Sequence, residues 1–495
     1  MQNHLVLLPI LLPLTGTAVG LALYRWRKVQ AWWSLGVMLA ALASGGWLLA
    51  QVWQDGQPLV FQSGGWAAPF GISLVADLLA ALLVVMSQIV LSLGLVYALG
   101  AKDNVVQYPS FYPLFLALAA GLTGAFLTGD LFNLFVFAEL VVIAGTVLTA
   151  VSDDRYGVEA ATKYFYMSLL AATFLLLANG TLYAAYGTLN MADLAARIQL
   201  DPSQPLLPVG MALLLATFMI KSAVFPMHFW QPDFHAAAPT AVSAMLSSVV
   251  VKLGVYGFLR MTTLLFVEQA AILRGLLVVL GIAGVLVGGL SAVGTHNVKR
   301  MLAYSTLAQV GFILVGIGWG TPLALAAAIV FIVNHSFVKS ALLMLAGALA
   351  SRTAVKSASF AVVTGLGKHV PAIGVLFFIG ALALAGIPPT NGFISKFLLF
   401  DSGLAGAQWT ALAFLALGSL TTFIYTMRAF QRIWWQPPPA EVKLKPTGDR
   451  LLAPALLIGL VVILGVWAAP LVTAAQAAAE WLGQPAQYVQ LVLGG

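Results

Sequence analysis

Long apolar runs separated by short polar stretches dominate the chain. Apolar runs of about 17 to 25 residues have the length of a membrane-spanning helix, and by that measure the pattern predicts about 14 spans. Their cores are expected at residues 4–23, 32–52, 73–99, 111–128, 131–151, 164–186, 206–227, 239–262, 271–292, 302–319, 322–349, 371–400, 407–433 and 451–472. The first run lacks the charged start and cleavage site of a signal peptide, so we interpret it as a retained helix. Residues 473–495 are expected to form a surface helix or tail.

Composition leads to the same class. The 495 residues are 61% hydrophobic and only 8% charged, whereas a soluble chain carries about a quarter charged residues. The pattern therefore predicts an all-α polytopic membrane protein. There is no cysteine, which excludes disulfides, thiolate metal sites and iron–sulfur clusters. We find no Walker A sequence, no dinucleotide fingerprint and no cluster at metal-ligand spacing, so no cofactor and no metal are predicted.

The distribution of basic residues predicts the orientation. Of the 23 Lys and Arg residues, 16 fall in the odd-numbered loops, and only Arg197, Arg260 and Arg274 fall in the even-numbered loops. Because positive charge is enriched on the cytoplasmic side, the odd loops are predicted to be cytoplasmic and both termini to lie outside. The location expected is the cell membrane, and the net charge of +7 then reflects this asymmetry and not nucleic-acid binding.

The remaining four basic residues, Lys221, Lys252, Lys339 and Lys396, lie deep inside predicted spans. A lysine near a helix end can extend to the headgroups, but these four are too far from either end. A charge near the bilayer centre costs at least about 2.5–3.5 kcal/mol, so it normally faces a protein interior or a wet cavity. Burial lowers a lysine pKa and a nearby carboxylate raises it, which allows proton exchange when the partner moves. Four such lysines favour a proton relay.

One carboxylate, Glu139 in "FNLFVFAELVVIAG", lies well inside a predicted span. It is the expected acidic partner of the buried lysines. The alternative is a static ion pair that joins two helices, but buried pairs are weak stabilisers and such a pair would not require four lysines. Asp77, near the start of the third span, is expected at the interface.

Two predicted spans are interrupted by proline. "MIKSAVFPMHFWQPDFHAAAPT" breaks the seventh span directly after Lys221, and "LALAGIPPTNGFISKFLLF" breaks the twelfth directly before Lys396. Proline frees backbone carbonyls, which are tolerated at membrane depth only where protein or water satisfies them. The alternative is two ordinary kinks, although each lies beside a lysine.

The five-span interval between the breaks predicts two inverted five-helix repeats, an architecture typical of transporters. Because five is odd, the second repeat enters the membrane in the opposite direction. The predicted organisation is an N-terminal three-helix segment at 1–110, a first repeat at 111–262, a second repeat at 263–435, and a basic loop, last helix and tail at 436–495.

Several motifs resemble a known family. "TGDLFNLFVFAEL", "KSAVFPMHFWQPDFHAAAPTAVSAMLSSVVVKLGVYGFLR", "NVKRMLAYSTLAQVGFI", "NHSFVKSALLMLAG" and "LAGIPPTNGFISKF" together resemble the proton-conducting antiporter-like family. That family is shared by Mrp-type multisubunit sodium/proton antiporters and the large membrane subunits of respiratory complex I. The match covers about residues 120 to 400, and the first motif and the chain length are most similar to the D-type subunits of the Mrp branch.

The resemblance implies site residues in the first half of the chain. Glu139 matches the family's fifth-helix glutamate, and Lys221 matches the lysine of the broken seventh helix that pairs with it. Lys252 matches the eighth-helix lysine that connects two half-channels.

In the second half, His335 and Lys339 match a polar pair on the eleventh helix, and Lys396 matches a twelfth-helix residue that is lysine or glutamate among relatives. Gln309 stands where many complex I relatives have histidine. Because glutamine does not titrate, that step would need water or a neighbouring hydroxyl group, from Ser305 or Thr306.

The other histidines are weaker candidates. His228 and His235 flank Trp230 and Asp233 towards the predicted cytoplasmic side. His228 is a candidate for proton entry because histidine titrates near neutral pH, and packing or capping is an equally good interpretation.

Three functions follow from these residues. The first is a proton-translocating, non-enzymatic subunit of a multisubunit sodium (monovalent cation)/proton antiporter with other membrane subunits as partners. The second is the homologous pump subunit of a complex I-like or membrane-bound hydrogenase redox complex. The third, a carrier of an organic solute, would need aromatic and hydrogen-bonding side chains at the breaks, where this chain has lysines.

Overall fold

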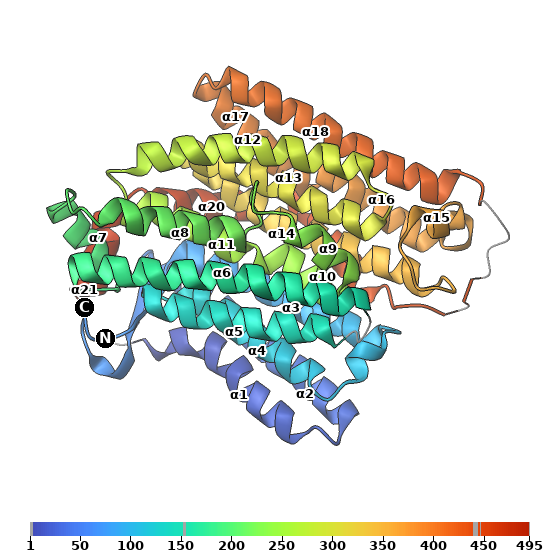
Figure 1. The fold of residues 1–495 in the computed structure, drawn as a ribbon, viewed down its shortest axis with the longest axis horizontal. Coiled ribbons are helices and arrows are strands. Elements are labelled where there is room, and N and C mark those ends of the chain that lie inside the picture. The colour runs from blue at the N-terminus through green and yellow to red at the C-terminus, as the bar shows by residue number, and fades with distance from the viewer. Residues whose placement is uncertain (1–2, 152–154, 439–443, 446, 495) are drawn as a thin grey trace.

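The computed structural model describes residues 3–151, 155–438, 444–445 and 447–494. The helices run roughly parallel to one long axis, and both termini lie at the same end of the bundle (Figure 1). We call this end the terminal end. The opposite end, which carries Lys163, Arg300 and α15 (Phe360–Val363), is called the basic end.

Three long helices and a hairpin form the N-terminal segment: α1 (Leu8–Ala22), α2 (Arg27–Asp55), β1 (Leu59–Gln62), β2 (Ser73–Ala76) and α3 (Leu78–Gly100). The two strands pair antiparallel, with Leu59 opposite Ala76 and Gln62 opposite Ser73. The side chain of Asp77 caps α3 by accepting a hydrogen bond from the backbone N–H of Ala80 at 2.8 Å. The hairpin thus leads directly into a capped helix at the terminal end.

The next eight helices include the first broken span. They are α4 (Phe111–Leu127), α5 (Leu131–Ala150), α6 (Arg155–Tyr186), α7 (Met191–Leu200), α8 (Leu207–Lys221), α9 (Trp230–Ala237), α10 (Thr240–Met245) and α11 (Lys252–Arg260). Between α8 and α9 the backbone leaves the helix, with Ala223 at φ 52° and a cis peptide bond before Pro226. Two π-helical segments, Leu246–Val250 and Met261–Leu265, flank α11.

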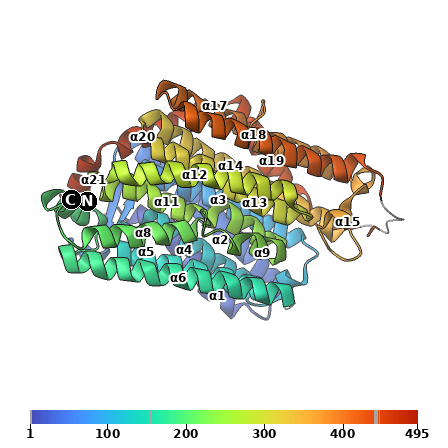
Figure 2. The same ribbon diagram turned by 45° about the horizontal axis from the view of Figure 1, so that its top comes forward.

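The following group contains the second broken span. It comprises α12 (Ala270–Gly294), α13 (Val298–Trp319), α14 (Pro322–Ser351), α15, α16 (Pro371–Ala385), α17 (Asn391–Ala405) and α18 (Trp409–Phe430), which continues into a π-helical turn, Gln431–Trp435. α16 ends at Gly386, whose φ of 86° is the left-handed conformation that glycine adopts without strain. In Figure 2, α17 and α18 lie along one edge of the bundle and α6 along the other.

The chain closes with α19 (Leu452–Val466), α20 (Ala469–Leu482) and α21 (Pro485–Leu493). α19 and α20 meet at an angle of 78°, a third break that the sequence did not predict. The expected surface tail at 473–495 therefore begins too early: α20 buries Ala475 and Ala478 completely and packs against α14 and α3.

Within the described residues, ten helices are long and apolar enough to cross a membrane, or eleven if the bent α19–α20 pair counts as one span. Three shorter apolar helices, α4, α8 and α16, accompany them. The predicted all-α polytopic membrane fold is confirmed, whereas the number of 14 spans is not. α8 and α16 are too short to count because each is half of a proline-broken span.

The two halves of the bundle share matched features at opposite ends. At the terminal end, Asp130 caps α5 and forms a β-bridge with Asn190, which precedes α7. At the basic end, Asn297 caps α13 and forms a β-bridge with Ser359, which precedes α15. We propose the division into repeats at 111–262 and 263–435, and this inverted correspondence supports it.

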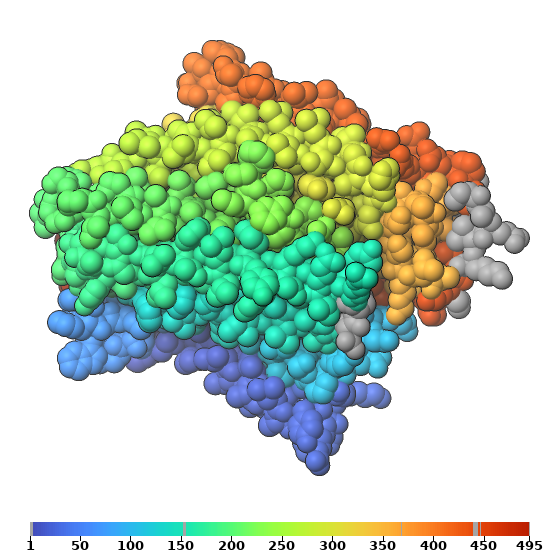
Figure 3. All heavy atoms as spheres, in the orientation of Figure 1, coloured from blue at the N-terminus to red at the C-terminus, as the bar shows by residue number. Residues whose placement is uncertain are grey.

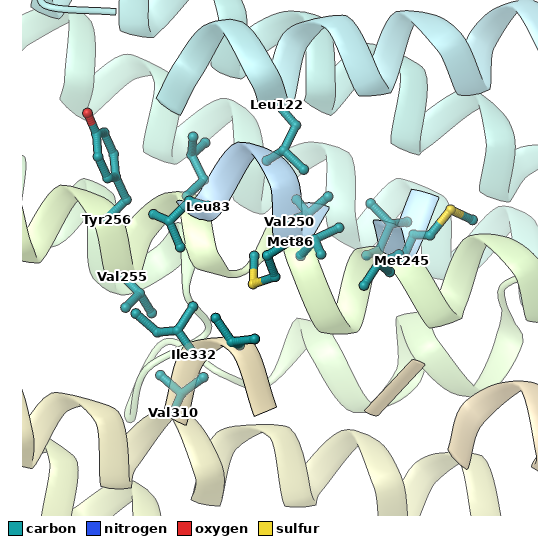
Figure 4. Close-up of a cluster of buried hydrophobic side chains, with 14 of the residues drawn as sticks. Leu83, Met86, Leu122, Met245, Val250, Val255, Tyr256, Val310 and Ile332 are labelled. Carbon is teal, nitrogen blue, oxygen red and sulfur yellow. The ribbon is translucent and has the colours of Figure 1, made fainter. Parts of the chain in front are cut away.

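Three spans form the interior of the bundle. The most apolar windows of Thr240–Leu265 and Pro322–Ser351 are completely buried, and that of Val298–Trp319 is almost so. Figure 4 shows apolar side chains from α3, α4, α11, α13 and α14 packed together, with Met86 and Val250 near the centre. The polar residues of these spans are thus enclosed by protein, not by lipid.

The outer helices present apolar side chains to the surroundings. Less than half of the corresponding window is buried on α2, α5, α6, α12 and α18. α2 exposes Trp32 near one end and Trp47 and Trp53 near the other, the arrangement of an aromatic belt at both membrane interfaces.

Candidate functional site

The first contact of the site joins α5 and α8. Nζ of Lys221 lies 3.4 Å from Oε1 of Glu139. The lysine side chain is 7% exposed, whereas that of the glutamate is 24% exposed on the outer surface of α5. Lys221 is the last residue of α8, so the break leaves its side chain free to reach across to α5. At 3.4 Å the pair is longer than a strong charge-assisted hydrogen bond and can open with little rearrangement.

A small cavity of about 20 Å³ lies beside this pair. Its wall includes Lys221, the hydroxyl-bearing Tyr164 and Ser168, and Trp230, whose Nε1 has no hydrogen-bond partner in the described part of the chain. One water molecule needs roughly 10–15 Å³ and two to four polar neighbours, and the cavity offers both. Its lining also includes Val250 and Leu253, which lie on either side of Lys252 in the sequence, but not Lys252 itself.

The second contact joins α11 and α14 in the middle of the bundle. Nζ of Lys252 lies 2.5 Å from Nδ1 of His335, and both residues are almost completely buried. The π-helical turn Leu246–Val250 ends just before Lys252. π-Helical turns often occur at functional sites because they change the facing of the residues that follow. This turn was not predicted, since no residue type marks it in the sequence.

The third contact joins α14 and α13. Lys339 lies one turn after His335, and its ammonium donates to the carbonyl oxygen of Leu302 at 2.8 Å and, over a short contact, to Oγ of Ser305. The Ser305 hydroxyl, expected as one substitute for a missing histidine, is thus in place beside the lysine. The other hydroxyl, that of Thr306, faces Ser247 at 2.8 Å instead.

Gln309 contributes to a polar group between α13 and α18. Its Nε2 donates to Oγ1 of Thr422 at 3.3 Å, and the buried Tyr425 hydroxyl lies among Ser305, Gln309 and Thr422. The sequence analysis missed Thr422 and Tyr425, because a threonine and a tyrosine in a lipid-length span are not distinguishable from packing residues without their neighbours.

Lys396 occupies the second break. Its ammonium donates to the carbonyl oxygen of Ala385 at 2.9 Å and lies 4.8 Å from the centre of the Phe312 ring. Ala385 is the last residue of α16, where unpaired carbonyls carry the negative end of the helix dipole. Nearby on α17, Ser395 accepts a hydrogen bond from Asn334 at 3.4 Å, and the amide of Asn391 is fully buried. The lysine beside the break thus satisfies a carbonyl that the break exposes.

His228 and His235 differ in their surroundings. His228 is half-buried, and its ring lies 5.7 Å from that of Phe225. His235 on α9 is completely buried, and neither ring nitrogen has a hydrogen-bond partner among the described residues. Of the two, His235 is therefore the fully buried ring without a hydrogen-bond partner in the described residues, although the sequence favoured His228 for proton entry.

A second buried ion pair lies near the terminal end. Arg260 at the end of α11 is 3% exposed, and its Nη1 lies 2.6 Å from Oδ2 of Asp77. Its guanidinium lies between the rings of Tyr256 and Tyr488, at 4.9 and 5.3 Å. The expectation that Arg260 is a loop residue was wrong, because the helix continues past it as Met261–Leu265. Asp77, expected at the membrane interface, is buried in protein at the start of α3, where Tyr488 of α21 covers the pair.

The site is thus a series of short contacts and not one continuous chain. Direct contacts join Glu139 to Lys221, Lys252 to His335, and Lys339 to Ser305. Among the described residues, no hydrogen bond or ion pair joins these three contacts to one another or to Lys396. Proton transfer between them would have to use water.

Comparison with known proteins places these residues in a context. The family model "NADH:quinone oxidoreductase/Mrp antiporter, TM" matches residues 128–424, a range that contains Glu139, Lys221, Lys252, His335, Lys339 and Lys396. The chain is 34% identical to the D subunit of the Na(+)/H(+) antiporter of Bacillus subtilis (strain 168), over 99% of this chain and 100% of the relative.

Two further similar proteins come from the two kinds of complex that share this family, a redox complex and an Mrp complex. The chain is 36% identical to the N subunit of NADH-quinone oxidoreductase from Desulforudis audaxviator, over 94% of this chain and 96% of that protein. Among solved structures, a chain of the Mrp complex from Dietzia sp. DQ12-45-1b superposes with a TM-score of 0.89, at 29% identity and full coverage of both chains.

Proposed function

This chain belongs to the NADH:quinone oxidoreductase/Mrp antiporter transmembrane family, and on that premise we propose that it is the proton-translocating, D-type subunit of a multisubunit sodium/proton antiporter. It is a transporter component and not an enzyme. The observation that carries the proposal is the pairing of Glu139 with Lys221 and of Lys252 with His335 across buried helix interfaces.

Each of the three contacts, Glu139–Lys221, Lys252–His335 and Lys339–Ser305, holds a proton that can pass to the next contact. Opening of the 3.4 Å Glu139–Lys221 pair changes the charge beside the 20 Å³ cavity, whose lining includes Leu253, the residue after Lys252. A charge change at one unit alters the energy of the proton on the next, because charges interact strongly in a low-dielectric interior. His335 and Lys339 continue the series on α14, and Lys396 ends it at the second break. In this scheme, protons move through Glu139, Lys221, Lys252, His335, Lys339 and Lys396.

Water has to connect the units. The proline breaks support this requirement, since irregular backbone at membrane depth is satisfied by protein groups or by water. The buried amide of Asn391 and the buried ring of His235 provide polar groups at the second and the first break. We propose that the basic end faces the cytoplasm and both termini lie outside, on the basis of the distribution of Lys and Arg.

Another membrane subunit covers α5. Glu139 lies within a strip of exposed apolar residues on that helix: Phe132, Val136, Ile143 and Val147. A partly exposed carboxylate facing lipid would be costly, so its exposed side requires a polar cover. A neighbouring subunit can supply that cover and a proton donor or acceptor. The structural relative from Dietzia is itself a chain of a complex, which supports such a neighbour here.

The pump subunit of a redox complex is the second candidate, because the relative from Desulforudis audaxviator is a subunit of NADH-quinone oxidoreductase. Purification of the intact complex from its membrane separates the two. Small hydrophobic subunits alone are expected, and vesicles that contain the complex should release protons when sodium is added. Co-purifying flavin or iron–sulfur subunits, or an absence of cation-dependent proton flux, would overturn the proposal that this chain is an antiporter subunit.

A further inference from the structure

A charged group at the basic end holds the second half of the first broken span. Asp233 on α9 uses both carboxylate oxygens: Oδ2 lies 2.9 Å from Nζ of Lys163 on α6, and Oδ1 lies 2.9 Å from Nη2 of Arg300 on α13. α6 belongs to the first proposed repeat and α13 to the second. A single side chain therefore fastens α9 to both repeats.

This group lines a cleft of about 480 Å³ that opens at the basic end. Asp233, Ala236 and Ala237 of α9 form one wall, and the first turn of α6 and the start of α13 form the others. Figure 3 shows the teal start of α6, the yellow of α13 and the orange segment before α15 adjoining at this end. His235, fully buried, lies on the inner side of the same helix. A movement of α9 would shift the cleft wall and the histidine together.

We infer that Asp233 is a positioning residue for proton entry: it clamps α9 between Lys163 and Arg300 and so holds the buried His235 ring in a fixed place behind the basic-end cleft. This inference rests on the proposed function. The other polar and charged groups that face Asp233 are Glu159 and Tyr156 of α6, Asn297 of α13 and Ser357. Glu159 bonds Lys163 at 2.7 Å but does not reach α9.

The two ion pairs that Asp233 makes are individually weak. Side-chain exposures of 33% to 47% leave both ion pairs open to solvent and salt, and such pairs add little to folding stability. A stability role alone is therefore a poor explanation for two pairs on one carboxylate. The corresponding position in the other break holds Lys396, which follows Pro389 by the same seven residues that separate Asp233 from Pro226. Each broken span thus carries a charged residue seven positions after a proline of its break, the fourth residue of α9 and the sixth of α17.

The test uses the intact complex in vesicles. Asp233→Asn should lower the initial rate of proton flux by roughly tenfold, since two weak pairs are lost together. Glu159→Gln, a matched control on the α6 wall of the same cleft, should keep the rate. Raising ionic strength with choline chloride should slow the wild type and leave the Asp233→Asn variant unchanged, because exposed ion pairs are screened by salt. The paired charge reversal Asp233→Arg with Arg300→Asp should restore more flux than either single reversal.

A second measurement does not depend on transport. Since the chain has no cysteine, an Ala236→Cys substitution introduces a single thiol at the cleft wall. A water-soluble thiol reagent should label it several-fold faster with Asp233→Asn than without. Equal labelling rates, or a double reversal no better than the single variants, would overturn the clamp. If the wild-type complex showed no cation-dependent proton flux, the proposed function would fail, and the labelling rates would still decide the position of α9.

Discussion

The ammonium nitrogen of Lys252 on α11 lies 2.5 Å from Nδ1 of His335 on α14, and this contact connects the two proposed repeats in the centre of the bundle. A contact this short needs one nitrogen to donate and the other to accept, and either the lysine or the imidazole can take each role. Two protonated groups would be two donors facing each other. The contact as observed therefore holds one proton between its two nitrogens, which is the condition for passing it on.

Replacement of His335 by alanine should block this transfer. The variant leaves Nζ of Lys252 without its partner in a fully buried position. We expect proton flux to fall by about 100-fold, the lower range for loss of a group that transfers a proton. Vesicle flux at matched complex abundance measures it. Ser336→Ala is the control, since the Ser336 hydroxyl bonds the carbonyl oxygens of Ser248 and Ile332 outside the series and its loss should leave flux intact. Undiminished flux in His335→Ala would remove the Lys252–His335 contact from the pathway.

Glu139 and Lys221 should behave as one unit. Glu139→Gln keeps the side-chain shape but cannot titrate, and we expect it to abolish antiport while the complex still assembles. Lys221→Ala should do the same by removing the cation 3.4 Å away. The double variant should be no worse than either single variant, because residues that act together give non-additive effects.

Glu139→Asp serves as the control for this pair, since it keeps the carboxylate and should retain part of the flux. Assembly is monitored by the yield of the intact complex, and flux by the vesicle assay. Additive losses in the double variant would mean that the two residues work separately. Normal flux in Lys221→Ala at every pH would show that the pair plays no part in transport.

The buried pair of Asp77 and Arg260 should control stability and not transport. Asp77→Asn removes the charge that compensates a buried guanidinium, and breaking such a pair costs about 3–5 kcal/mol. We expect a lower unfolding temperature and less assembled complex. Asp77→Leu with Arg260→Met removes both charges and should recover most of the stability. Thermal unfolding of the detergent-solubilised complex measures this, and an Asp77→Asn complex as stable as wild type would contradict it.

Much of the architecture could be predicted because its signals are local. Apolar length marks a span, and the prolines at 226, 388 and 389 mark the breaks, since each removes a backbone donor. The lysines were recognisable because a charge far from both ends of an apolar run has few structural explanations. The family resemblance then supplied the pairing of Glu139 with Lys221, which the structure shows as a contact.

The rest depends on packing between distant segments. The pair of Asp77 and Arg260 joins the N-cap of α3 to the end of α11, and no local pattern links them. The bend between α19 and α20 depends on packing of α20 against α14 and α3. The hydrogen bond that Gln309 donates to Thr422 likewise forms only because α13 and α18 are adjacent.

The last prediction concerns Gly386, which ends α16 beside Lys396. A Cβ atom at this position would lie 2.5 Å from Cδ of Lys396, and the φ of 86° disfavours any residue with a side chain. Gly386→Ala should therefore push the ammonium away from the Ala385 carbonyl and lower proton flux, with the roughly 1–2 kcal/mol of strain typical of a left-handed non-glycine residue. Gly406→Ala is the matched control, because Gly406 also ends a helix but has φ −90° and its nearest contact at 3.4 Å.

Lys396→Ala should lose flux more completely, whereas Lys396→Glu, which keeps a titrating group, should retain part of it. Vesicle flux at matched abundance ranks the four variants. If Gly386→Ala and Lys396→Ala both transported like Gly406→Ala, protons would leave by another route and the second break would serve only to bend the span.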